Sequence, residues 1–405
     1  MEKKRISRRT FLNISATIAC TAAVQATPVN LFANDLKNKG KELPVLKGYE
    51  PCVKSIWVKN NEKKERFENL KRLIESTTDF AWLSKGDKVL IKLALNSGNK
   101  FPATSDPFVL NCLVNVLKEK EAGEISACDQ SGVEHVQFSV TEKRGSSRKL
   151  CDTSGLLKVI TENNITPVFF EEMGLDTFVE SNPEGTHSWK KPILIPSAVK
   201  ETDHIIYLPR VSSHIMADIT SGFKIGVGFL RDDSRYELHK NGKNFYEMYE
   251  EINNISEIKN KLRLIITSGR KVLSTFGPDN GYLSEPDHGL IMASEDLLAN
   301  ELLSYAWLQW NRQFNTSYFS KMTTGQITKF RSVINKVFVW KTWDRNEKEG
   351  TSSIPMFIPG DIYDHPSIYN FMKRKGGKPQ SIVWKSLNKN PDTSVTNYIK
   401  RLING

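Results

Sequence analysis

The chain has 405 residues and carries 57 Lys and Arg residues against 46 Asp and Glu residues, a formal net charge of +11. This length exceeds what one ordinary hydrophobic core holds and predicts two α/β units. No basic run is interleaved with aromatic residues and no nucleic-acid-binding motif is present, so we expect no nucleic-acid partner. After the N-terminus no stretch approaches the roughly 20 apolar residues of a membrane span, so we expect none.

The N-terminus has the pattern of a secretory signal of the twin-arginine type. A basic segment leads into "SRRTFL", a short and weakly apolar stretch follows, and "VQA" supplies the small residues that precede a cleavage site. Removal of residues 1–26 takes away five Lys and Arg residues and one Glu, which lowers the formal charge from +11 to +7. We therefore expect a periplasmic or extracellular protein that has the twin-arginine export machinery as a partner. Lipid attachment at Cys20 is disfavoured, because Thr17 is a poor match three residues before it.

Four cysteines remain after the signal: Cys52, Cys112, Cys128 and Cys151. An exported protein can join such residues in disulfides. Cys112 and Cys128 lie in apolar segments, which favours buried free thiols equally well. No CxxC pair is present, so we expect neither an iron–sulfur cluster nor a zinc ribbon.

The pattern of apolar residues predicts a linker at residues 27–60 and a first α/β lobe at 61–200. The lobe alternates helices and buried strands in the order that produces a mostly parallel sheet with right-handed crossovers. The expected helices are 60–77, 105–120 and 153–164, the last capped by Thr153 or Ser154, and the expected strands are 85–95, 123–129 and 166–172. Ligands of such sheets bind beyond the carboxyl ends of the strands.

A second α/β lobe is expected at residues 201–313. Its strands are predicted at 203–210, 262–267 and 290–294, and a long helix at 295–310. Residues 314–405 are less regular and rich in aromatic residues, and we expect this C-terminal segment to pack on the lobes. The predicted fold class is therefore α/β, with two lobes that have mostly parallel sheets and a crevice between them.

The order of motifs resembles the domain of unknown function 362 family from about Lys88 to Leu308. The matching pieces include "VLIKLALNS", "CDQSG", "TDHIIYLPRVSSHIMADITSGFKIGVG" and "GPDNG". Several positions depart from the family pattern. Lys92 is followed by "LALN" where the family usually has proline and asparagine, "PRVSSH" replaces "PKLKTH", Ile225 replaces an asparagine, and the ferredoxin module of some members is absent. The resemblance implies the fold and does not name a substrate.

The same region is also similar, more distantly, to the nickel-pincer lactate racemase family. That family has a histidine, a "GGxK" lysine and a second histidine, and here His214, Lys224 and His239 stand in that order. The resemblance implies that His214 is a catalytic base, that Lys224 anchors a nickel-pincer-like cofactor, and that His239 ligates a metal. His135, after "CDQSG", would be the counterpart base of the first lobe.

His214 and Lys224 can also be weighed by their chemistry alone. Imidazole is the commonest base near neutral pH, and a lysine near a strand end can bind an anion or react when burial lowers its pKa. Glycines around Lys224 would let backbone N–H groups approach a carboxylate or phosphate. The alternative is a structural loop whose histidine bonds buried carbonyl groups. Because functional residues gather on such loops, we favour a catalytic role for both.

Other candidates lie at strand ends and in turns. Lys92 and Asp129 end predicted strands and are expected to bind a cofactor, with an edge lysine and a capping aspartate as the alternatives. "FGPDNG" is interpreted as an ordinary turn. Asp296 and Glu301 are interpreted as helix-capping residues, and His365 as part of a surface turn.

These residues predict an exported enzyme that acts on a small anionic carboxylate substrate in the crevice. Its expected chemistry is proton abstraction next to the carboxylate, as in racemisation, with or without a metal or organic cofactor. The alternative is a non-catalytic protein that closes two lobes on a small-molecule ligand.

Overall fold

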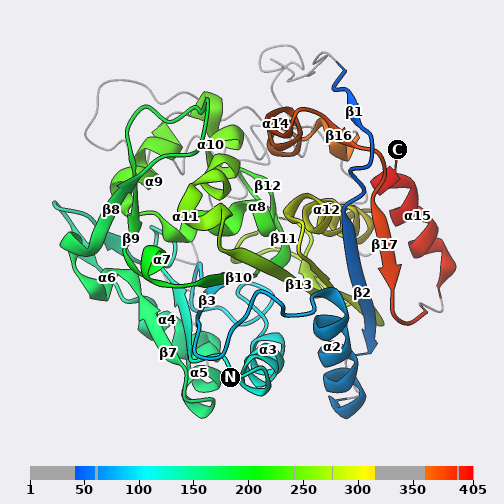
Figure 1. Ribbon diagram of the computed structural model, residues 1–405, viewed down its shortest axis with the longest axis horizontal. Helices are drawn as coiled ribbons and strands as arrows, with labels where there is room; N and C mark the ends of the chain where they lie inside the picture. Colours follow the sequence, from blue (N-terminus) through cyan, green and yellow to red (C-terminus); the bar gives the residue numbers. More distant parts are fainter. Residues whose placement is uncertain are drawn as a thin grey trace, which may run out of the picture.

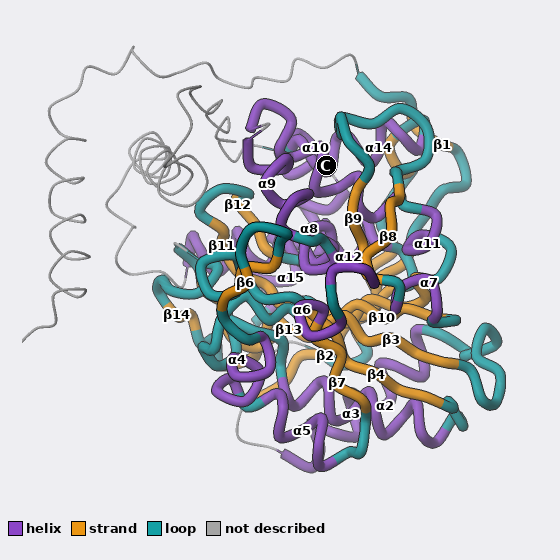
Figure 2. Tube along the Cα trace, turned by 90° about the vertical axis from the view of Figure 1, so that its left-hand side faces the viewer, coloured by secondary structure: helices purple, strands orange, loops and turns teal. Residues whose placement is uncertain are grey.

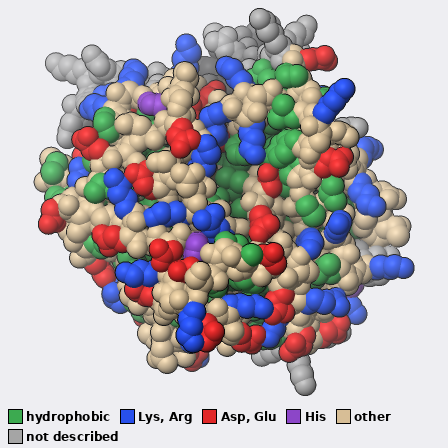
Figure 3. Space-filling model, viewed as in Figure 1, with side chains coloured by type: hydrophobic (Ala, Val, Ile, Leu, Met, Phe, Trp, Pro, Cys, Tyr) green, Lys and Arg blue, Asp and Glu red, His purple; other side chains and the backbone are tan. Residues whose placement is uncertain are grey.

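The computed structural model describes residues 42–59, 63–240, 242–275, 277–314, 361–389 and 392–404. The predicted signal and the first part of the predicted linker lie outside these residues, so export stays a prediction. Among the helices described, none is long and apolar enough to cross a lipid bilayer. Figure 3 shows basic and acidic side chains interspersed over the face in view.

A large mixed β-sheet, most of whose strand pairs are parallel, runs through the molecule (Figure 1). Its strands lie in the order β17 (Val383–Ser386), β2 (Cys52–Lys59), β15 (His288–Ser294), β13 (Leu262–Leu273), β10 (His204–Leu208), β3 (Lys88–Leu93), β4 (Glu124–Asp129) and β7 (Thr166–Phe169). Along this path only the β2–β15 and β15–β13 pairs are antiparallel. Three short strands branch from it: β11 (Arg210–His214), β12 (Asp218–Thr220) and β14 (Leu283–Ser284).

The strands of both expected lobes belong to this one sheet. Strand β10 pairs in parallel with β3 of the expected first lobe and with β13 of the expected second lobe. All five residues of β10 are buried, as a strand with neighbours on both edges and cover on both faces requires. The structure therefore does not separate two lobes, and the expected boundary near residue 200 falls between neighbouring strands of one sheet.

Helices cover both faces of the sheet. The helices of the described residues are α2 (Lys63–Thr77), α3 (Pro107–Glu119), α4 (Ser147–Ser154), α5 (Leu156–Glu162), α6 (Phe170–Met173), α7 (Ala198–Glu201), α8 (Gly222–Ile225), α9 (Asp232–Lys240), α10 (Phe245–Glu251), α11 (Ser256–Lys259), α12 (Leu297–Phe314), α14 (Pro366–Lys375) and α15 (Thr393–Asn404). Apolar side chains of α2, α3 and α5 share one core cluster with Val89 and Ile91. Those of α10, α12, α14 and α15 share the other with Leu90 and Ile205. Figures 1 and 2 show α2, α3 and α5 together on one side of the sheet.

Both ends of the described chain contribute to the sheet, which corrects the expected linker. Residues 52–59 form strand β2, and β17 from the C-terminal segment pairs with it in parallel. The lysines that flank the apolar residues of β2 hid this strand in the sequence. The C-terminal helices pack as expected on the rest of the fold, α14 against α10 and α15 against α12.

The helix expected at 153–164 is divided in two. Helix α4 begins after Ser146, whose hydroxyl accepts a hydrogen bond from Lys149 N, and it ends at Gly155. Gly155 has φ of 88°, a left-handed conformation that stops a helix, and α5 begins directly after it. Thr153 and Ser154 therefore lie in the last turn of α4 and do not cap α5.

The four cysteines expected to remain after the signal are free thiols, and all but Cys52 are buried. The structure thus agrees with buried thiols and shows no disulfide among Cys52, Cys112, Cys128 and Cys151.

Asp106 fixes α3 to β13 through a buried network. One carboxylate oxygen accepts hydrogen bonds from Phe108 N at 3.1 Å and Arg270 Nη2 at 3.0 Å, and the other accepts from Arg270 Nε and Ser268 Oγ, both at 2.8 Å. The carboxylate is therefore both the N-cap of α3 and the partner of a buried guanidinium.

We expect Asp106→Ala to lower the free energy of unfolding by about 3–5 kcal/mol, because it leaves the Arg270 charge buried without its partner. Asp392 is a matched control: its exposed carboxylate accepts a hydrogen bond from Ser394 N at the start of α15, and Asp392→Ala should cost only about 1 kcal/mol. Urea denaturation of both variants measures the difference. Equal losses would contradict the role of the buried ion pair.

Candidate functional site

A cavity of about 280 Å³ lies beyond the carboxyl ends of β3, β4 and β10. All the predicted site residues except His135 line it: Lys92, Asp129, His214, Lys224 and His239. His135 contacts Asp279, which lines the cavity, and so lies beside it. The residues selected from the sequence therefore lie together at one edge of the sheet.

Lys92 and Asp129 bind each other instead of facing a ligand. Their side chains are 1% and 4% exposed, and Lys92 Nζ lies 2.7 Å from Asp129 Oδ1. Lys92 Nζ also donates to Leu93 O at 2.7 Å, and Asp129 Oδ2 accepts from Leu95 N at 2.6 Å. Burial acts to raise the pKa of Asp129, and Lys92 opposes this shift. The pair joins β3 to β4 and holds the chain that leaves β3, which gives it a structural role; its predicted cofactor-binding role stays a prediction.

Gly228 lies over this ion pair. A Cβ atom at this position would lie 2.1 Å from Asp129 Oδ1 and 2.3 Å from Lys92 Nζ. The carbonyl of Gly228 accepts a hydrogen bond from Gln130 N, directly after β4. Only glycine lets the segment after α8 approach the strand ends this closely.

The backbone sets the tautomer of His214, which lines the cavity. Its Nδ1 accepts hydrogen bonds from Met216 N at 3.0 Å and Ala217 N at 3.1 Å. An imidazole nitrogen that accepts is unprotonated, so the neutral ring carries its proton on Nε2. In this tautomer Nε2 is a donor and Nδ1 is occupied by the backbone; the prediction that His214 is a catalytic base stays a prediction.

His239 has the opposite tautomer. Its Nδ1 lies 2.7 Å from Arg235 O, so Nδ1 carries the proton and Nε2 has the lone pair. Burial, together with the charges of Lys224 and Arg235, lowers the pKa of His239 to about 4. The ring is therefore neutral near pH 7 and acts as an acceptor.

Lys224 is buried and lies near other positively charged side chains. Its side chain lines the cavity from α8, and within the described residues its ammonium group makes no hydrogen bond or ion pair. Burial, followed by the charges of Arg210 and Arg235, lowers the pKa of Lys224 to about 7. The Lys224 side chain can therefore lose its proton near neutral pH.

Two arginines that the sequence analysis did not select line the same cavity. Arg210 is 1% exposed, donates to Pro278 O at 3.2 Å, and has a buried Nε without a partner among the described residues. Arg235 donates to Ser131 O and Gln130 O at 2.6 and 2.7 Å and so fixes the loop after β4. In the sequence, Arg210 stands in "LPR" at the end of a predicted buried strand. A cation at the end of such a strand is also the feature that identified Lys92.

The "GPDNG" segment also lines the cavity, which corrects its interpretation as an ordinary turn. Asp279 Oδ2 accepts from Asn96 Nδ2 at 2.7 Å, and Asp279 O accepts from Asn99 Nδ2 at 2.9 Å. Burial acts to raise the pKa of Asp279, but the contact with His135, the hydrogen bond from Asn96 and the charge of Arg210 outweigh it and hold the pKa below its ordinary value. Asp279 is therefore an ionised group facing the cavity.

Of the remaining candidates, only Asp296 acts as expected, since it accepts from Ala299 N at 2.9 Å at the start of α12. Glu301 instead accepts from Phe223 N at 3.0 Å and so holds α8, which carries Lys224. His365 was expected in a surface turn but is fully buried, with its ring centroid 5.3 Å from those of Tyr246 and Tyr305.

Residues 89–305 match the family model described as domain of unknown function (DUF362). This chain belongs to the DUF362 family. No match was found among curated proteins. Among solved structures, the chain resembles a protein from Thermotoga maritima with 17% identity over 53% of this chain and 52% of that one, at a TM-score of 0.34. It also resembles the lactate racemase apoprotein from Thermoanaerobacterium thermosaccharolyticum, with 14% identity over 57% and 55% of the two chains and a TM-score of 0.38.

The chain thus spans about half the length of these two solved structures. Both are distant likenesses of part of the fold. The family description names no activity, so the chemistry of the DUF362 domain has to be argued from its residues.

The surroundings of His239 do not fit a bare metal ion. In the described ranges, no group of three His, Cys, Asp or Glu ligand atoms includes His239. Its electrostatic neighbours are Lys224 and Arg235, whose charges repel a cation. The prediction of a metal ligand at His239 therefore requires a cofactor that brings other ligands and negative charge, and no step is assigned to such a group.

The Lys92–Asp129 pair gives a test of how the site is held. We expect Lys92→Met and Asp129→Leu each to lower the free energy of unfolding by about 3–5 kcal/mol, because each leaves one charge buried alone, and the double variant to lose less than the sum. The exposed pair Lys85–Glu121 is the control, with Lys85→Met expected to cost under about 1 kcal/mol. Chemical denaturation measures all four; additive losses at Lys92 and Asp129 would refute the coupling.

Proposed function

We propose that this DUF362 protein is an exported enzyme that acts on a small carboxylate substrate in the cavity described above. One observation carries the proposal: Arg210, Lys224 and Arg235 bring positive charge to a cavity whose other buried pair, Lys92 with Asp129, neutralises itself. Export is supported by the twin-arginine pattern of residues 1–26.

The charge balance favours an anionic ligand. Against Arg210 and Lys224 the buried wall offers Asp279, which interacts with both. Bringing buried cations together is unfavourable, and a bound carboxylate supplies the missing negative charge. The unpartnered Nε of Arg210 is a donor that a carboxylate oxygen can accept from.

The volume favours a small ligand. Pockets for drug-sized molecules measure roughly 300–1,000 Å³, and this cavity of about 280 Å³ lies below that range. A carboxylic acid of a few carbon atoms fits such a space.

The arrangement supports proton abstraction from the carbon next to the carboxylate. The neutral Lys224 amine takes the proton and becomes ammonium, while the electron pair of the C–H bond moves onto the carboxylate to form an enediolate. Arg210 and the Nε2–H of His214 stabilise the oxygens on which negative charge develops. Return of the proton to the other face of the carbon would give racemisation. Lys224 is thus the proposed base and His214 the proposed donor.

Carboxylate affinity should fall as the pH rises through 7. The pKa of Lys224 is lowered to about 7, so the ammonium form predominates below this pH and is lost as the pH rises above it. An anion that binds this form best loses up to about tenfold in affinity for each pH unit above 7. Isothermal titration calorimetry with short 2-hydroxy and 2-oxo carboxylates tests this dependence. Lys224→Met should remove the pH dependence, and the control Lys191→Met, at an exposed lysine, should retain it.

Catalysis should show the opposite pH dependence. In D2O, the α-proton of a bound carboxylate should exchange with solvent faster as the pH rises, because the base is the neutral amine of Lys224. We expect Lys224→Met to lower the exchange rate by about 10²–10⁴-fold and His214→Ala by about 10²–10³-fold, with His214→Ala changing affinity far less. Proton NMR measures the exchange. A carboxylate that binds but does not exchange would identify a binding protein instead of an enzyme.

A further inference from the structure

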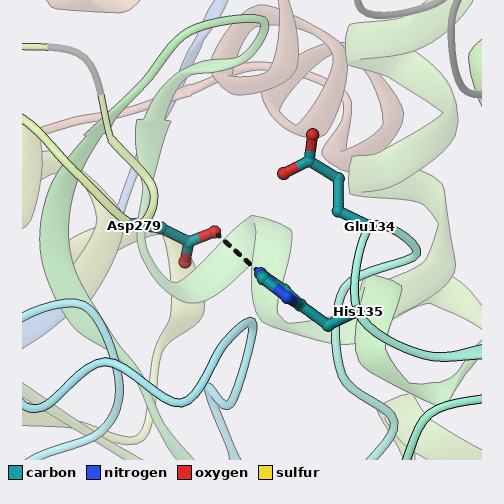
Figure 4. Close-up of side chains that lie close together, drawn as sticks. All are labelled: Glu134, His135 and Asp279. Carbon is teal, nitrogen blue, oxygen red and sulfur yellow. Dashed lines mark ion pairs between the residues drawn. The ribbon is translucent and has the colours of Figure 1, made fainter. Parts of the chain in front are cut away.

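Three potential metal ligands meet at the cavity, outside the groups assigned to the proposed reaction. Glu134, His135 and Asp279 each offer a ligand atom, and these atoms all lie within 4.8 Å of one another (Figure 4). His135 Nε2 is 3.8 Å from Asp279 Oδ2. Glu134 and Asp279 also line the cavity that contains Lys224.

The sheet explains why these residues meet. Glu134 and His135 follow β4, and Asp279 follows β13, two strands that run in the same direction in the sheet. Their carboxyl ends lie at the same edge, so the loops that leave them converge above the strands between them. The position of the cluster thus follows from the fold and not from a chance contact of surface side chains.

The spacing is close to what one ion requires. Bonds of about 2.0–2.2 Å in a tetrahedral site place two ligand atoms about 3.3–3.6 Å apart. The 3.8 Å between His135 and Asp279 exceeds this by a few tenths of an ångström. Glu134 is exposed, and its side chain has the rotatable bonds needed to close the remaining distance.

Asp279 has the features of a prepared ligand. Its Oδ1 is buried and has no hydrogen-bond partner among the described residues, while Oδ2 is oriented by Asn96. A carboxylate held by a neighbouring amide is the usual support around a metal site.

The charges that oppose a cation here include those of Arg210 and Lys224, which both interact with Asp279. An exposed carboxylate at Glu134 adds a second negative charge on the solvent side, where a high dielectric constant weakens repulsion between an ion and the buried arginine. The two carboxylates together offset the charge of a divalent ion.

We propose that Glu134, His135 and Asp279 bind one divalent transition-metal ion at the cavity. One imidazole nitrogen and two carboxylate oxygens without sulfur suit Zn²⁺ or Mn²⁺. The ion would polarise an oxygen of the substrate held by Arg210 and Lys224. This catalytic role rests on the proposed function, whereas binding of the ion does not.

The test uses the full chain, freed of metal with a chelator and dialysed against Zn²⁺ or Mn²⁺, with elemental analysis of bound metal. We expect one ion per chain, and at least about tenfold weaker binding in Glu134→Gln and in His135→Ala. Glu142→Gln is the matched control: Glu142 is an exposed neighbour that pairs with Arg144, and its loss should leave binding unchanged. The absorption spectrum of the Co²⁺ form should change in the two ligand variants and not in the control.

Absence of stoichiometric binding, or binding that Glu134→Gln and His135→Ala leave unchanged, would overturn the metal site. Because Glu134 is exposed, its substitution does not threaten folding, and the result stands even if His135→Ala is unstable. Carboxylate titration of the chelator-treated protein separates the two proposals. Affinity retained there without any metal binding would leave the proposed function intact.

Discussion

The cavity depends on the buried ion pair between Lys92 and Asp129. These two side chains are almost fully removed from water and bind each other, with Leu93 O and Leu95 N completing their hydrogen bonds. The pair ties together the carboxyl ends of β3 and β4, and Gly228 brings the segment after α8 down onto it. The pair thus shapes the cavity. Because its two charges offset each other, the charges that a ligand meets come from Arg210, Lys224 and Asp279.

The backbone decides what the two histidines do. The turn after β11 directs two N–H groups at His214, and α9 directs a carbonyl at His239. The same side chain therefore becomes a donor on one wall and an acceptor on another. A sequence shows that a histidine is present but not which nitrogen holds the proton, so the tautomers of His214 and His239 could not be predicted from it.

The sequence predicted those parts of the fold and site that depend on local pattern. Apolar runs located β3, β4 and β10, and polar residues at or beyond their ends located Lys92, Asp129 and His214 at one edge. Pairings between strands that are distant in the chain could not be predicted from the sequence. The pairing of β10 with β3, which joins the two expected lobes in one sheet, leaves no local pattern.

The same limit applied to single residues within the site. In the sequence, Arg210 is the last residue of a predicted strand and Asp279 lies in a predicted turn. In the fold, both residues line the cavity and interact with each other. Lys92 and Asp129, which each looked available to a ligand, turned out to be partners.

The positive charge of the cavity links binding to protonation. Burial lowers the pKa of Lys224 and of His239; the charges of Arg210 and Arg235 add to the shift of Lys224, and those of Lys224 and Arg235 add to the shift of His239. A bound carboxylate reverses this effect, because its charge favours the protonated form of every group around it. Uptake of the anion should therefore draw a proton into the cavity. In the proposed reaction, the positive charge that favours a carboxylate adds to the effect of burial on Lys224, whose pKa of about 7 lets one residue take up and return a proton.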